Sequence, residues 1–144
     1  MSRHTARESA FQLLYQLEIR PEDSLLQMED YLQQMPISDK KDRAYFERLI
    51  RGVTQNLSEI DEIISKYLRG WTMDRQLVTD LAILRLAVFE LLFDTEVPAE
   101  IAISEAVIFA NEYGTEESRS FINAVLGSVA KTEELRTQAA TKDA

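Results

Sequence analysis

Residues 73–93 form a segment that is apolar on nearly every side, and this segment constrains the fold more than any other part of the chain. Its apolar positions are Leu77, Val78, Leu81, Ile83, Leu84, Leu86, Val88, Leu91 and Leu92. Because a helix that is apolar all round must be enclosed by other elements, we expect a central helix of a bundle here. Arg85 and Glu90 interrupt it. Since isolated buried charge is costly, each is expected to have an ion-pair partner, with anchoring of a partner protein as the alternative.

The remainder of the chain also has helical periodicity. Apolar residues recur three and four positions apart, which predicts an all-α fold. The other expected helices cover residues 3–19, 23–35, 39–55, 58–69, 98–112 and a final segment after Thr115. Gly70 and Gly114 suit helix ends, Thr72 and Thr115 suit N-caps, and Pro98 suits a first turn. The sequence therefore predicts a compact bundle of six or seven helices.

The chain length of 144 residues predicts one domain, over 1–131, followed by a tail over 132–144 that is expected to fray. There is no Cys and one His, which leaves no thiolate metal site and little for zinc or triad chemistry. Phosphate-loop and hydrolase motifs are absent, so we expect no enzyme, no metal and no cofactor. No signal-peptide pattern or long apolar run occurs, which predicts a cytoplasmic protein outside membranes.

Charge is unevenly distributed. The net charge of −9 disfavours general attraction to nucleic acid, yet positive charge gathers in two N-terminal patches. One patch is Arg3, His4 and Arg7. The other lies within residues 40–51, where Lys40, Lys41 and Arg43 are interpreted first as a solvated turn. Residues 52–118 carry 4 basic and 13 acidic side chains, which suits a basic partner.

One side of the first expected helix combines Arg3, His4, Arg7, Phe11 and Tyr15. Cations contact phosphates and aromatic rings stack on unpaired bases, so this side is a candidate RNA-binding face. In the alternative interpretation, the two rings pack against a neighbouring helix and the arginines are simply solvated. Composition alone favours this alternative.

Two further acidic positions remain open between structural and binding roles. Asp80, near the start of the central helix, is either an exposed acid stabilised by the helix dipole or a contact for a basic protein. Glu117, at the start of the last helix, repels phosphate but can accept hydrogen bonds from base amino groups. Phe121, one turn later, is either a core residue or part of the same binding surface.

Four ordered segments resemble a known family. They are residues 6–15, 45–53, 81–91 and 97–126, the last of which includes Gly-Thr-Glu-Glu-Ser and Phe-Ile-Asn. Together they resemble the NusB family of bacterial transcription antitermination factors, over residues 3–130. The resemblance implies two three-helix bundles and a non-enzymatic function. That function is binding of boxA RNA in ribosomal RNA transcripts together with the ribosomal protein NusE, so that RNA polymerase passes termination signals.

The resemblance also implies roles for individual residues. The positions implied for RNA contact are Arg3, His4, Arg7, Tyr15, Glu117 and Phe121. Asp80 matches an acidic position at the NusE contact. Because the start of the chain has fewer arginines than is common in the family, we expect weaker or more NusE-dependent RNA binding. Some NusB-like proteins self-associate, so a homodimer is a further expectation.

Two other functions compete with this interpretation. One is the NusB-like domain of a ribosomal RNA cytosine methyltransferase, which requires a separate catalytic domain. The other is a structural helical adaptor without an RNA role.

Overall fold

The computed structural model describes residues 3–70, 72–94 and 96–143, with side chains described as far as residue 133. Across these residues the chain is entirely helical, without a strand, so the predicted all-α fold is confirmed. The helices are α1 (His4–Ile19), α2 (Ser24–Gln34), α3 (Lys40–Gln55), α4 (Leu57–Ser65), the short 3₁₀ helix η1 (Met73–Arg75), α5 (Val78–Leu92), α6 (Ala99–Tyr113) and α7 (Ser118–Asp143).

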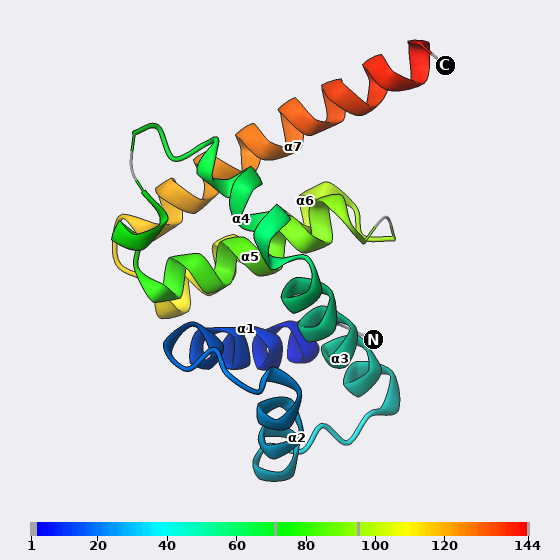
Figure 1. Ribbon diagram of the computed structural model, residues 1–144, viewed down its shortest axis with the longest axis vertical. Helices are drawn as coiled ribbons and strands as arrows, with labels where there is room; N and C mark the ends of the chain where they lie inside the picture. The colour runs from blue at the N-terminus through cyan, green and yellow to red at the C-terminus, as the bar shows by residue number, and fades with distance from the viewer. Residues whose placement is uncertain (1–2, 71, 95, 144) are drawn as a thin grey trace.

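The helices form two groups that share α5 as their centre. In Figure 1, α1, α2 and α3 make up the lower part of the molecule, and α4 to α7 make up the upper part. Helix α5 contacts α1, α3, α4, α6 and α7. Every residue from Asp80 to Glu90 is buried, which confirms the predicted central helix. Neighbouring helices therefore enclose the apolar segment on all sides, as its composition requires.

The predicted helix over 73–93 is divided in two. The short η1 covers Met73–Arg75, Gln76 and Leu77 have extended backbones, and α5 begins only at Val78. Asp74 and Arg75 are exposed. If α5 continued through them, these charged side chains would extend a buried helix, which charged residues rarely do. The break leaves Leu77, predicted as a core residue, exposed at the surface.

A buried arginine connects α5 to two neighbouring helices. The guanidinium of Arg85 donates to both carboxylate oxygens of Asp61 on α4, at 2.8 and 3.0 Å, and to Glu18 on α1. Burial acts to lower the pKa of Arg85, but the hydrogen bonds with Asp61 and Glu18 outweigh it and raise that pKa. The expectation that Arg85 has an ion-pair partner is confirmed.

Close packing between α3 and α5 depends on one glycine. A Cβ atom on Gly52 would lie 2.2 Å from atoms of the Phe89 ring, much closer than a real contact. The absence of a side chain at this position therefore lets α3 lie directly against α5. This approach brings the polar residues of α3 within reach of those at the end of α5.

The last helix begins and ends later than expected. Thr115 precedes a turn, its backbone N–H donates to the Ser118 hydroxyl at 2.9 Å, and α7 starts at Ser118. The helix then continues to Asp143, while the side chains of residues 134–144 lie outside the described part of the chain. The domain boundary at residue 131 therefore stays a prediction. Within the described residues, no helix combines the length and apolar character needed to cross a membrane.

Candidate nucleic-acid interface

A buried ion network holds the start of α1 against α5 and α6. Arg7 is only 4% exposed, and its Nε lies 2.9 and 3.0 Å from the two carboxylate oxygens of Glu90. A second nitrogen of Arg7 lies 3.4 Å from Glu105 on α6. Burial acts to lower the pKa of Arg7, but the hydrogen bond and charge of Glu90 outweigh it and raise that pKa. The guanidinium is therefore charged and buried, with Nε and one terminal nitrogen paired to carboxylates.

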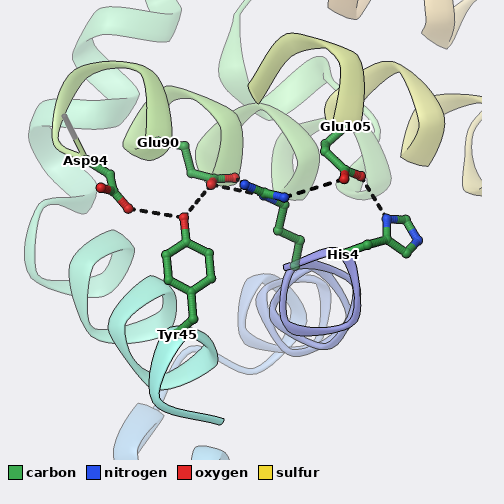
Figure 2. Close-up of polar contacts among 6 residues, drawn as sticks. His4, Tyr45, Glu90, Asp94 and Glu105 are labelled. Atoms are coloured by element: carbon green, nitrogen blue, oxygen red, sulfur yellow. Dashed lines mark hydrogen bonds and ion pairs between the residues drawn. The ribbon is translucent and has the colours of Figure 1, made fainter. Parts of the chain in front are cut away.

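The network continues from α5 to α3 (Figure 2). The Tyr45 hydroxyl donates to Glu90 at 2.5 Å, and a carboxylate oxygen of Asp94 lies 3.1 Å from the same hydroxyl. Burial, followed by the hydrogen bond and negative charge of Glu90, raises the pKa of Tyr45 far above its usual value. Tyr45 is therefore a neutral donor. Asp94 also accepts from Arg48 at 3.2 Å, which connects the network to the surface of α3.

His4 lies at the other end of the network and faces α6. Its Nδ1 is 2.8 Å from a carboxylate oxygen of Glu105, as Figure 2 shows. Its ring stacks on Phe109, with 5.3 Å between centroids and 16° between planes. The imidazole is thus half-buried and oriented by the contacts with Glu105 and Phe109, and part of the side chain remains exposed.

The structure corrects the predicted outward face of α1. Arg7 points inward, because Glu90 and Glu105 offer it carboxylates that compensate for lost hydration. Phe11 is buried and stacks on Phe109, as the alternative interpretation expected. Arg3 and Tyr15 remain exposed, Tyr15 to 40%, and His4 is half-buried. Arg7 is therefore almost entirely enclosed, and its paired guanidinium is a poor ligand for a phosphate.

Three other candidate residues line a hollow at the opposite end of α5. This hollow has a volume of about 400 Å³ and lies between η1, the start of α5 and the start of α7. Its walls include Asp80, Glu117 and Phe121, together with Arg69 and Arg75. The fold thus joins residues that the sequence separates by about forty positions into one concave surface.

Asp80 is the unusual member of this hollow. It is 5% exposed rather than the solvated acid of one interpretation, and its Oδ1 has no hydrogen-bond partner among the described residues. Burial raises the pKa of Asp80, and the nearby Ser118 hydroxyl offsets this only in part. Because buried polar atoms nearly always have partners, this oxygen is a candidate acceptor for a group from outside the chain.

Glu117 and Phe121 differ in their exposure. Glu117 is exposed, whereas Phe121 is partly buried and packs against the hydrophobic core while still lining the hollow. Phe121 therefore belongs in part to the core, and its role in a binding surface stays a prediction.

The two candidate regions lie at opposite ends of one helix pair. Contacts of Arg7 with Glu90 and of Glu18 with Arg85 show that α1 and α5 run antiparallel. Arg3 consequently lies near the end of α5, while Tyr15 lies in the half of α1 directed toward its start. The predicted site residues do not converge on a single point. Together they span the length of the α1–α5 pair.

Sequence reasoning did not single out Tyr45, Asp94, Glu105 or Arg48 as parts of this region. The contacts of the Tyr45 hydroxyl with Glu90 and Asp94 were not foreseen from the sequence. One signal was available, because a charge buried at Glu90 in the central helix requires hydrogen-bond donors from neighbouring helices. Among the described residues, no cluster of three or more acidic, His or Cys side chains is arranged to hold a metal ion.

Comparison with known proteins identifies the chain's relatives. A family model described as the NusB family matches residues 4–131. The chain belongs to the NusB family. The transcription antitermination protein NusB of Acetivibrio thermocellus is 43% identical over 131 residues, covering 91% of this chain and 90% of the relative. The same-named protein of Bacillus velezensis is 36% identical and covers 90% of this chain and 95% of the relative.

Solved structures of the NusB family share the fold. The structure of T. maritima NusB has a TM-score of 0.84 at 42% identity, and the match covers 91% of this chain and 92% of that one. A crystal structure of the antitermination factors NusB and NusE in complex with double-stranded RNA has a TM-score of 0.84 at 28% identity. This match covers 92% of this chain and 99% of that one. The family and the fold expected from the sequence are confirmed.

Proposed function

We propose that this protein binds boxA RNA of ribosomal RNA transcripts together with NusE, and that it acts in transcription antitermination without catalysing a reaction. The observation that carries this proposal is the match to the NusB family over residues 4–131. The curated relatives have the name of transcription antitermination protein, and one similar structure contains NusB, NusE and RNA. These names favour this function over a methyltransferase domain or a structural adaptor. RNA polymerase in its transcribing complex is the proposed wider setting.

The proposed RNA contacts follow from exposure and chemistry. Arg3 contacts phosphate, and the exposed ring of Tyr15 stacks on an unpaired base. The exposed carboxylate of Glu117 accepts from a base amino group, and Phe121 offers the accessible side of its ring. His4 contributes its exposed edge. Arg7 acts indirectly, because its ion pairs fix the start of α1 and with it the position of Arg3.

The proposed NusE contact is the hollow around Asp80. Its unpartnered Oδ1 accepts a hydrogen bond from an N–H or a cationic side chain of NusE. Such a bond compensates for the cost of the buried carboxylate, which explains why an acidic residue is tolerated at this position. The apolar wall formed by Phe121 and Val125 provides area for the rest of the contact.

Binding of labelled boxA RNA to this protein, with and without NusE, tests the proposal. We expect stable association with NusE, and tighter binding to boxA than to an RNA of the same composition in scrambled order. We expect the preference to be clearest when NusE is present, since the N-terminal cations are few. A double-stranded RNA of the same length should be included, because the similar complex contains duplex RNA. Lack of a NusE complex, or equal affinity for both sequences, would contradict the proposal; sizing of the free protein tests for a homodimer.

A further inference from the structure

A second basic surface lies on α3, outside the residues assigned above. Lys41, Arg48 and Arg51 are all exposed. Their spacings of seven and three residues place them on one side of the helix, because an α-helix repeats every 3.6 residues. At about 1.5 Å of rise per residue, they extend over roughly 15 Å. The sequence alone had suggested only a solvated turn at the beginning of this segment.

The fold places this surface next to the N-terminal cations. A hollow of about 480 Å³ is lined by Arg3 together with Lys41 and Arg48 from α3, and also by Asp42. The Arg3 guanidinium lies over the Tyr45 ring, 4.3 Å from its centroid. Two basic patches that are almost forty residues apart in the sequence therefore form one continuous surface across α1 and α3.

The cations of this surface are only partly neutralised. Arg3 pairs with Glu96 at 3.8 Å, but both side chains are largely exposed, and such pairs contribute little and exchange readily. Arg48 is oriented by the buried Asp94, while half of its side chain remains exposed. Within the described residues, no carboxylate lies within ion-pair distance, 4.0 Å, of Lys41 or Arg51. Most of this charge is thus available to an external anion.

We propose that Lys41, Arg48 and Arg51 bind the phosphate backbone of single-stranded RNA and extend the RNA path from Arg3 along α3. This inference rests on the proposed function, because it places RNA at Arg3. The surface supplies cations that the sparse arginine cluster at the N-terminus lacks. It offers no exposed aromatic ring, so its contacts are to phosphates and are independent of base sequence.

A charge-removal pair with a matched control tests the inference. The test variant is Lys41→Gln/Arg51→Gln, which leaves the Arg48–Asp94 pair intact. The control is Lys66→Gln/Lys131→Gln, which removes the same charge from exposed positions at the end of α4 and on α7. Affinity for boxA RNA is measured with NusE at several salt concentrations, and thermal unfolding confirms that each variant is folded.

We expect the negative slope of log K against log salt to become shallower by about 1.4 in the test variant, since each of the two lost phosphate contacts to a single strand contributes about −0.7. The control should keep the wild-type slope, and both variants should keep the preference for boxA over scrambled RNA. Equal slopes in the two variants would overturn the α3 surface while leaving the proposed function standing. A lost sequence preference with an unchanged slope would also overturn it. If the unaltered protein with NusE binds no RNA, the proposed function fails as well.

Discussion

Two carboxylates at opposite ends of α5, Glu90 and Asp80, are both buried but differ in their surroundings. Glu90 is approached by the guanidinium of Arg7 and the hydroxyl of Tyr45. Asp80 has one oxygen without any partner among the described residues. Burial by itself therefore does not distinguish a structural charge from one that awaits a ligand. The completeness of the hydrogen bonding makes this distinction. A buried acceptor without a donor has an unfavourable free energy that only a further donor removes.

The two ends also differ in their nearby cations. At the Glu90 end, Arg7 lies within 3 Å and is itself buried, so the pair is shielded from solvent. At the Asp80 end, Arg69 and Arg75 line the same hollow but are exposed, and neither forms an ion pair with Asp80 in the described part of the chain. We call the Glu90 end closed, because its buried charges are paired, and this end stabilises the fold. We call the Asp80 end open, because its buried carboxylate keeps a desolvation cost that a bound partner can relieve.

The largest effect is expected at the closed end. Glu90→Ala should lower the free energy of unfolding by about 3–5 kcal/mol, because it removes the main partner of a buried arginine. Urea denaturation followed by circular dichroism measures this loss. The double variant Arg7→Leu/Glu90→Leu is the control, and it should recover much of the stability because two apolar side chains replace the charges. A loss below about 1 kcal/mol in the single variant would show that the network contributes little.

The sequence predicted the fold better than the site, for a physical reason. Apolar periodicity located the helices to within a few residues, since it reports directly which side of each helix is buried. It missed the break before Val78, where Asp74 and Arg75 end the apolar pattern. It also placed Arg7 outside. Periodicity does not reveal that Glu90, 83 residues away, supplies the counter-charge that makes burial of an arginine tolerable.

The position of Asp80 was similarly beyond sequence reasoning. Its location in the first turn of α5 left open a solvated acid and a contact for a basic protein, and only the packing of α7 against that turn encloses it. The basic side of α3 was visible as a run of charges. Its proximity to Arg3 was not, because it depends on the packing of α1 against α3.

The second prediction concerns binding at the open end. Asp80→Ala should weaken association with NusE by about 1.5–3 kcal/mol, the usual contribution of a hydrogen bond to a charged group. Calorimetric titration of NusE into the variant measures this change. Asp74→Ala is the matched control, because it removes an exposed acid from the adjacent η1. If both variants bind NusE as tightly as the unaltered protein, the contact lies elsewhere.

Substitution of Tyr15 is expected to affect RNA binding but not the stability of the fold. Tyr15→Ala should weaken boxA RNA binding by about 1–3 kcal/mol, which is the range for stacking of one base on an aromatic ring. Its free energy of unfolding should change by no more than about 0.5 kcal/mol, because the side chain is exposed. Tyr15→Phe retains the ring and should retain the affinity. A large loss of stability in the alanine variant, with no change in RNA binding, would identify Tyr15 as a packing residue.

The smallest expected effect is a pH dependence that belongs to Asp80 alone. Burial raises its pKa in the folded protein above the usual 3.8, so the folded state binds a proton more readily than the unfolded chain. Its ionised form therefore costs stability at neutral pH, and this cost disappears as the pH falls from above the raised pKa to below 3.8. Asp80→Asn, which cannot ionise, should be more stable than the unaltered protein at pH 7, and the advantage should shrink across that window. Urea denaturation of both proteins over this pH range, with Asp74→Asn as the control, measures the difference. A constant advantage at every pH would mean that folding leaves the pKa of Asp80 unchanged, so that burial does not penalise its ionised form, and the contrast between the two ends of α5 would then be lost.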